Sequence, residues 1–247
     1  MPSAAAERLR TRRTTWRPSH RLVPSRFPPT GLFDRVADPA DLDAVFALEA
    51  MTNDRLREEA GDLRLVPPSE RITGPGTSPI MAAFTHLNPE GSRFSDGSFG
   101  VYYCAHELDT ALAEVRYHRE IFMRRTREGP MRLDLRLYLA DLDARLVDVR
   151  HQPECHRPDD NAGSRALGAD SRRAGRDGIL YRSVRHPGGT CAAVLRPAVL
   201  RNCRQSGHYT FHYDGNRIVA IDALATVWTA GDAAVDGGPR REPDPTD

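Results

Sequence analysis

The sequence predicts an α+β fold with antiparallel sheets and flanking helices, and three observations support this prediction. Short β-prone segments lie mostly in the second half of the 247-residue chain, whereas helical patterns are mostly early and central. Strands and helices do not alternate regularly along the chain. No G-x-G-x-x-G motif follows a predicted strand, which disfavours a doubly wound nucleotide-binding fold. Segregated strands and helices are typical of α+β proteins with antiparallel sheets.

The first part of the chain contains an arm, a short extended segment and one helix start. Residues 1–20 are rich in arginine and lack apolar periodicity, so we expect a flexible N-terminal arm. An extended segment begins at Arg21. Asp38-Pro39 indicates a helix start, because Asp is a good N-cap and Pro fits the first helical position. For the apolar segment Ile80–Leu87, a helix and a buried strand are both open interpretations.

The rest of the chain is organised around Gly91–Glu120. A Gly- and Ser-rich loop leads into a short aromatic strand over Gly100–Ala105, and a helix follows. At about 100° per residue, Glu114 lies at the edge of the apolar stripe of this helix. A carboxylate there can face a cleft while the helix stays docked, and a solvated glutamate explains the pattern equally well. The apolar stripe consists of Leu108, Leu112, Val115 and Phe122.

The second half of the chain predicts further strands, one helix and a tail. Strict alternation over Met131–Leu139 is typical of a half-buried strand. Residues 227–247 lack periodicity and are expected to be a disordered tail. The other expected elements are strands at Leu146–Val149, Gly178–Arg185 and Cys191–Leu195, a helix at Ser164–Arg173, and a hairpin of His208–Tyr213 with Arg217–Ile221.

Composition limits the class of protein. The chain is 39% apolar and 28% charged, as expected of a soluble globular protein, and no run approaches the ~18 apolar residues of a membrane helix. No secretory signal is visible at the N-terminus. A net charge of +1 offers no global basic field for nucleic acid. Four cysteines far apart in the sequence indicate reduced thiols in a cytoplasm rather than structural zinc.

The basic side chains exclude several kinds of chemistry. All of them are arginines, which rules out a P-loop lysine, a Schiff-base lysine and a lysine general base. Nine histidines show no helical metal-binding spacing, so we expect no metal. No G-x-S-x-G motif supports a hydrolase nucleophile. Arginine remains the fixed cation, and it binds phosphates and carboxylates in a bidentate manner.

Five residues lie where a strand or helix meets a Gly-, Ser- or Pro-rich loop: Arg21, Arg93, Tyr103, Glu114 and Ser183. Each has a simple structural explanation, as a surface charge, a core aromatic, a solvated carboxylate or a turn cap. Together they suit an anionic nucleotide. Two arginines would hold a pyrophosphate and a tyrosine ring would stack on a base. A glutamate would bind ribose hydroxyls and stabilise the positive charge that develops at the anomeric carbon.

These residues resemble those of the RES-domain proteins, a family named for its Arg, Glu and Ser. The matching segments are HRLVPSRFPP around Arg21, GSRFSDGSFGVYY around Arg93, DTALAEV around Glu114 and GILYRSVRHPGG around Ser183. Ser164 in NAGSRALG is similar to a nucleotide-contacting serine of some members. The resemblance extends from Arg21 to Ile221, and we assign the RES domain to residues 21–226.

The resemblance implies a fold similar to ADP-ribosyltransferases, with a split antiparallel β-sheet core. It also implies the toxin of a bacterial type II toxin–antitoxin pair, similar to the ParT-type branch. Such a toxin would consume NAD+ as substrate and pass ADP-ribose to a protein, phosphate or water. The implied partner is an antitoxin with a small helical toxin-binding domain.

The resemblance also implies roles for single residues. Glu114 would be the main catalytic group, assisted by Arg21 and Ser183. The residues implied to bind NAD+ are Arg21, Arg93, Tyr103, Ser164 and Ser183. Two other classes of function stay open: a non-enzymatic interaction module, and nucleic-acid binding through the arginine-rich arm.

Overall fold

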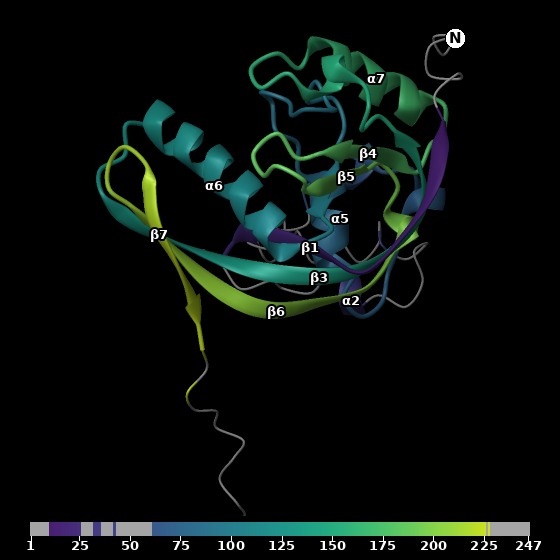
Figure 1. The fold of residues 1–247 in the computed structure, drawn as a ribbon. Helices are drawn as coiled ribbons and strands as arrows, with labels where there is room; N and C mark the ends of the chain where they lie inside the picture. Colours follow the sequence, from purple (N-terminus) through teal and green to yellow (C-terminus); the bar gives the residue numbers. More distant parts are fainter. Residues whose placement is uncertain (1–9, 26–31, 36–41, 43–60, 226, 228–247) are drawn as a thin grey trace, which may run out of the picture.

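The computed structural model describes residues 10–25, 32–35, 42, 61–225 and 227 (Figure 1). Seven strands form one mixed sheet in the order β1-β2-β5-β4-β3-β6-β7, and β1 also pairs along β3. The strands are β1 (Thr11–Pro24), β2 (Tyr102–Ala105), β3 (Met131–Asp148), β4 (Gly178–Arg182), β5 (Thr190–Val194), β6 (Leu200–Tyr213) and β7 (Ile218–Leu224).

Four α-helices and four short 3₁₀ turns connect the strands in the described part of the chain. The α-helices are α2 (Leu32–Arg35), α5 (Ser78–Thr85), α6 (Leu108–Arg125) and α7 (Ala162–Arg173). The 3₁₀ turns are η2 (Leu63–Leu65), η3 (Pro68–Glu70), η4 (Pro153–His156) and η5 (Pro197–Val199). The predicted helix start at Asp38-Pro39 lies outside the described residues.

Strand β1 corrects the expected flexible arm over residues 1–20. The strand begins at Thr11, and Thr11–Trp16 pairs antiparallel with residues 142–147 of β3. Thr14 and Trp16 are buried, whereas the residues between and beside them are exposed. This strand was missed because Trp16 is the one large apolar residue on its inward face, so no period-two pattern is visible among the arginines. Residues 1–9 lie outside the described part.

Strand β3 joins two strands that the sequence predicts separately. The predicted break follows Leu139, yet Ala140, Leu142 and Ala144 are all buried and continue to Leu146. Leu135 and Leu137 before the break belong to one apolar cluster, whereas Ala140, Leu142 and Ala144 after it belong to the other. One face of the long strand is therefore covered along its first part and the other face along its second part. In the sequence, this change of face breaks the apolar alternation and looks like the end of a strand.

The sheet is mixed, whereas the sequence predicts an antiparallel one. Residues 146–148 of β3 pair in parallel with Gly178–Leu180 of β4, and the other pairings are antiparallel. The connection from β3 to β4 passes through η4 and α7, and a helical crossover of this length is what parallel pairing requires. The α+β class is confirmed, and the antiparallel description is wrong at this one pairing.

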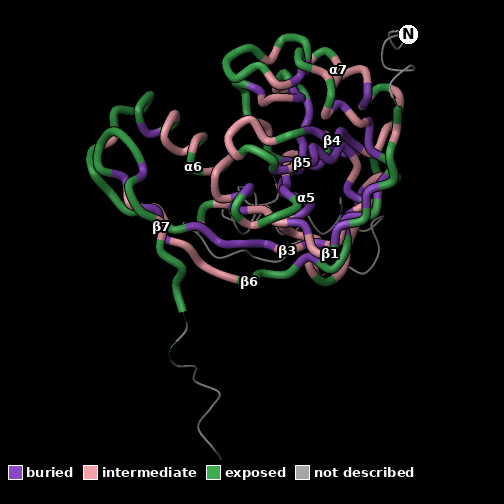
Figure 2. Tube along the Cα trace, in the orientation of Figure 1, coloured by how far each residue is buried: buried purple, intermediate pink, exposed green. Residues whose placement is uncertain are grey.

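The sheet separates two apolar clusters of buried residues. Figure 2 shows buried residues along β3, β4 and β5. Ile80, Met81 and Phe84 of α5 pack on one face, in a cluster that contains Tyr102 and Leu142. The structure thus resolves the open alternative at residues 80–87 in favour of a helix. Helices α6 and α7 pack on the opposite face, where their apolar residues contact a cluster of Leu137, Ile179 and Phe211.

Helix α6 connects β2 with β3 and presents the stripe that the sequence predicts, with one exception. Leu108, Leu112 and Val115 pack against the sheet. Phe122 is 52% exposed, and Met123 takes the buried position at the end of the helix instead. Towards its C-terminal end the helix is also held to the β6–β7 turn, since Glu120 accepts a hydrogen bond from the Ile218 amide at 3.0 Å.

Candidate active site

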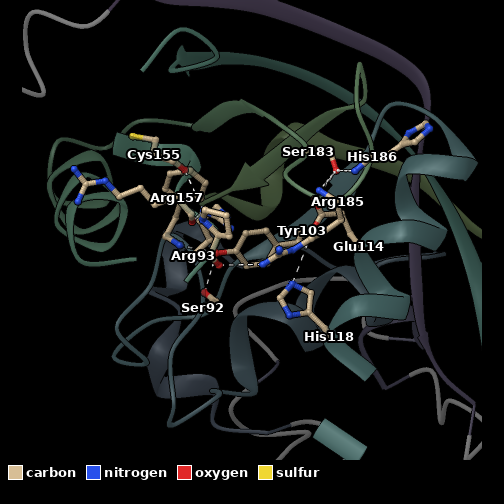
Figure 3. Close-up of polar contacts among 12 residues, drawn as sticks. Ser92, Arg93, Tyr103, Glu114, His118, Cys155, Arg157, Ser183, Arg185 and His186 are labelled. Carbon is tan, nitrogen blue, oxygen red and sulfur yellow. Dashed lines mark hydrogen bonds and ion pairs between the residues drawn. The ribbon is translucent and has the colours of Figure 1, made fainter. Parts of the chain in front are cut away.

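A carboxylate–hydroxyl pair joins α6 to the end of β4 (Figure 3). Ser183 follows the last residue of β4, and its Oγ donates a hydrogen bond of 2.6 Å to Oε1 of Glu114. The Glu114 side chain is 19% exposed, and its Oε2 lies 3.9 Å from Nε2 of His118 one helical turn later. A short hydroxyl–carboxylate bond of this kind is strong and directional. Glu114 is therefore a positioned carboxylate and not a freely solvated one.

The backbone of the β4–β5 loop orients the Ser183 hydroxyl. Ser183 Oγ accepts hydrogen bonds from the amides of Arg185 at 3.1 Å and His186 at 2.9 Å. The hydroxyl has one hydrogen and two acceptor lone pairs. Because both lone pairs receive amide hydrogens, the single hydroxyl hydrogen is left to point at Glu114.

A second contact fixes the same loop on α6. Nδ1 of His186 lies 2.8 Å from Oγ1 of Thr110, which is fully buried in the first turn of the helix. The helix and the loop approach closely at Gly189, where a Cβ would lie only 2.5 Å from Thr110 Oγ1. A side chain at position 189 would therefore displace Thr110 and disturb the contact between the loop and α6.

Tyr103 of β2 supports the loop that precedes the strand. Its hydroxyl lies 2.8 Å from Ser92 Oγ and accepts a hydrogen bond of 2.9 Å from the Phe94 amide. Burial raises the pKa of the Tyr103 phenol, so the group stays neutral. The hydroxyl is thus used in holding the loop, and the ring is the part that can contact a planar ligand.

Two arginines lie beside this pair and contact the segment that follows β3. Nη1 of Arg93 donates to the carbonyls of Cys155 and Arg157, both at 3.1 Å. Nη2 of Arg185 donates to the Pro158 carbonyl at 3.0 Å. Its guanidinium carbon lies 3.2 Å from the ring centroid of Tyr117 on α6. Figure 3 shows Arg93, Tyr103, Arg185 and Glu114 in one group.

Helix α7 holds the Arg93 loop from the other side. Ser164 is fully buried in its first turn and bonds the Asn161 carbonyl at 3.1 Å. Arg165 donates to the carbonyls of Ser92 at 3.0 Å and Glu90 at 2.8 Å. The Ser164 hydroxyl therefore bonds the start of its own helix, and the next residue, Arg165, holds the loop.

The structure places Arg21 on the other face of the sheet from α6. Arg21 pairs with Tyr138 in register, and Tyr138 belongs to the apolar cluster that contains α5. Its guanidinium carbon lies 4.7 Å from the Tyr102 ring, and Nη1 donates to the Tyr103 carbonyl at 3.0 Å. Arg21 thus bridges the narrow contact between β1 and β2. It reaches the site through the backbone of Tyr103.

Three general features of the described residues bear on the kind of protein. No group of three or more His, Cys, Asp or Glu side chains among them is placed to hold a metal ion. In the same part of the chain, no helix is both long and apolar enough to cross a membrane. All four cysteines are free thiols and buried.

Comparison with known proteins identifies the family. The sequence profile of the RES domain matches residues 68–214, which is more than half of the chain and contains Arg93, Glu114 and Ser183. The chain therefore belongs to the RES-domain family, and the resemblance seen in the sequence is confirmed. Arg21 lies outside the matched range.

Two similar proteins provide the wider context. The uncharacterized protein y4oC of Sinorhizobium fredii (strain NBRC 101917 / NGR234) is 35% identical over 210 residues, which cover 83% of this chain and 86% of that protein. Among solved structures, the M. tuberculosis MbcT–MbcA toxin–antitoxin complex contains a chain that is 13% identical, with a TM-score of 0.44. That match covers 83% of this chain and 87% of the other.

The sequence reasoning missed three residues of the site, namely Thr110, Arg185 and His186. Arg185 and His186 follow Ser183 within the segment SVRHPGG, whose turn-forming residues bring them back towards the same strand end. The closeness of Arg185 to Ser183 in the sequence could have indicated that Arg185 belongs to the site. Thr110 gives no signal, because a buried threonine near a helix start is usually a structural residue.

Proposed function

We propose that this RES-domain protein is an NAD+-consuming toxin that breaks the bond between nicotinamide and ribose. The observation that carries the proposal is the 2.6 Å hydrogen bond from Ser183 to Glu114. It holds a mostly buried carboxylate beside two arginines and the Tyr103 ring, and this is a set of groups suited to a dinucleotide. Membership of the RES-domain family supports the proposal, since the family resemblance implies this chemistry.

Glu114 is the group that stabilises the reacting centre. When the glycosidic bond breaks, nicotinamide leaves with the bonding electron pair and positive charge develops on the ribose carbon and ring oxygen. A fixed carboxylate stabilises that charge best if it needs no reorganisation as the charge appears. The acceptor then forms the new bond to the ribose carbon and loses a proton. Ser183 keeps the carboxylate in place by donating to Oε1.

We propose that the acceptor of ADP-ribose is one of three chemical groups. A protein side chain gives an ADP-ribosyltransferase, phosphate gives a phosphorylase and water gives a glycohydrolase. We propose that the protein acts in the cytoplasm, where NAD+ is available. We also propose that an antitoxin with a small helical domain neutralises it by covering the surface around Glu114.

The direct test is to incubate the purified protein with NAD+ and measure free nicotinamide by chromatography. We expect nicotinamide to appear, and added phosphate to raise the rate if phosphate is the acceptor. A labelled-NAD+ experiment on cell lysate detects transfer to protein. If NAD+ remains intact under all three conditions, the enzymatic proposal is wrong and a non-enzymatic interaction module becomes the better interpretation.

Ser183→Ala tests the positioning of Glu114. The variant removes the hydroxyl that bonds Oε1, and with it the acceptor of the Arg185 and His186 amides. We expect a loss of about 10- to 100-fold in kcat, because loss of a charged hydrogen bond has this size. Nicotinamide release at saturating NAD+ measures the effect. Ser206→Ala, an exposed change on β6, is the control and should keep full activity.

A further inference from the structure

The guanidinium groups of Arg93 and Arg185 converge on one short backbone segment. Arg93 lies in the loop before β2 and donates to the carbonyls of Cys155 and Arg157. Arg185 lies in the loop after β4 and donates to the carbonyl of Pro158. Because these carbonyls belong to four consecutive residues, the two cations lie near each other although they come from distant parts of the chain.

Arg185 is held in this position by an aromatic ring. Its guanidinium carbon lies 3.2 Å from the ring centroid of Tyr117, which stands on α6 almost one turn after Glu114. An arginine that stacks on a ring and also bonds a carbonyl is already ordered before a ligand arrives. Less conformational entropy is then lost when the ligand binds.

Neither of these arginines has an acidic partner among the salt bridges of the described residues. Their bonds go to neutral carbonyls, and these bonds use Nη1 of Arg93 and Nη2 of Arg185. The other guanidinium nitrogens of both residues can still donate to a ligand. Two like charges held close together repel each other, so an anion between them lowers the free energy of the arrangement.

The environment of His118 agrees with this geometry. Its side chain is 71% exposed, and its pKa is lowered, first by the partial burial of the ring, although Glu114 opposes the shift. The positive charges of Arg185, Arg93 and Arg119 lower it further. The charges of Arg93 and Arg185 both act on His118, which lies next to Glu114. Both charges are therefore on the Glu114 side of the sheet.

We propose that Arg93 and Arg185 together form a binding site for the diphosphate of a nucleotide. Arg185 thus takes the role that the sequence reasoning assigned to Arg21, whose side chain lies against Tyr102 on the opposite face. The identity of the nucleotide as NAD+ rests on the proposed function, whereas the diphosphate site can be tested without turnover. Two guanidiniums from different loops can each bind one phosphoryl group of a diphosphate in a bidentate manner, whereas a monophosphate presents only one phosphoryl group.

Calorimetric titration of the full-length protein with ADP, AMP and adenosine provides the test. We expect the wild type to bind ADP at least about 10-fold more tightly than AMP. Arg185→Gln should weaken ADP binding by about 10- to 100-fold, the size expected for lost charged hydrogen bonds, and should abolish the preference for ADP over AMP. Arg116→Gln, at an exposed position on the outer side of α6, is the matched control and should bind ADP as the wild type does.

Any of three results would overturn the site. The Arg185→Gln variant could keep the preference for ADP over AMP, or the Arg116→Gln variant could lose as much affinity for ADP as Arg185→Gln does. The third is an unchanged KM for NAD+ in Arg185→Gln. Thermal unfolding of each variant separates loss of binding from loss of fold, and Arg185→Lys adds a folded variant that keeps the charge but not the bidentate geometry. If the wild type binds ADP through Arg185 but never cleaves NAD+, the site stands and the proposed function fails. If NAD+ is cleaved with an unchanged KM in Arg185→Gln, the proposed function stands and the site fails.

Discussion

Glu114→Gln is expected to reduce nicotinamide release from NAD+ by about 10²- to 10⁴-fold, the range typical of a lost electrostatic or acid–base group. The amide has nearly the same shape as the carboxylate and can still accept the Ser183 hydrogen bond through its oxygen. The negative charge that would face the developing cation is lost. We therefore expect the fold and the KM for NAD+ to change little, whereas kcat falls.

Glu107→Gln is the matched control for this variant. Glu107 is the N-cap residue of the same helix, makes no side-chain cap bond, and has a side chain that is 65% exposed. Its change should leave nicotinamide release within about twofold, because surface substitutions usually have small effects. A Glu114→Gln protein that turns over NAD+ at the wild-type rate would show that Glu114 is a structural residue.

The toxin proposal makes a parallel prediction in cells. Expression of the wild-type protein should stop bacterial growth and lower the NAD+ content, and Glu114→Gln should relieve both effects at equal protein levels. If growth stops equally with the wild type and the variant, toxicity does not depend on this carboxylate. Measuring NAD+ and growth in the same cultures separates these cases.

Several parts of the fold could be predicted because they depend on local sequence patterns. The stripe on α6, except at Phe122, and the β6–β7 hairpin are confirmed, since apolar periodicity and an Asp-Gly turn specify them over a few residues. The family resemblance assigned Glu114 and Ser183 to the same site without predicting a contact between them, and in the structure the two side chains are hydrogen-bonded.

Other parts could not be predicted, because they depend on contacts between distant segments. The pairing partner of β1 lies more than a hundred residues later, and it supplies the burial that the arginine-rich segment lacks by itself. The face on which Arg21 lies depends on a register shift between Trp16 and Ser19. A shift of one residue moves every following side chain to the opposite face, and no composition pattern reveals it.

Gly168→Ala is expected to destabilise the protein by about 3 kcal/mol, a value typical of overpacking in a close-packed interior. A Cβ at this position of α7 would lie 1.9 Å from the carbonyl oxygen of Phe94 and 2.7 Å from its carbonyl carbon. Both are backbone atoms, so no side-chain rotation can relieve the clash. The gain in helix propensity of about 1 kcal/mol is too small to offset it.

The same change should weaken the site, because α7 would be pushed away from the loop that carries Arg93. The Phe94 amide donates to the Tyr103 hydroxyl, so a shift of Phe94 also disturbs Tyr103. We expect the melting temperature to fall by about 10 °C. We also expect the KM for NAD+ to rise at temperatures where the variant is still folded.

Gly163→Ala on the same helix is the control for this prediction. The nearest atom to a Cβ at that position is the Glu154 carbonyl oxygen at 4.0 Å, which is an ordinary contact. Removing a glycine from a helix without a clash should leave stability unchanged or raise it by up to about 1 kcal/mol. Equal melting temperatures for Gly168→Ala and Gly163→Ala would contradict the close approach of α7 to Phe94, and with it the role of α7 in holding the Arg93 loop.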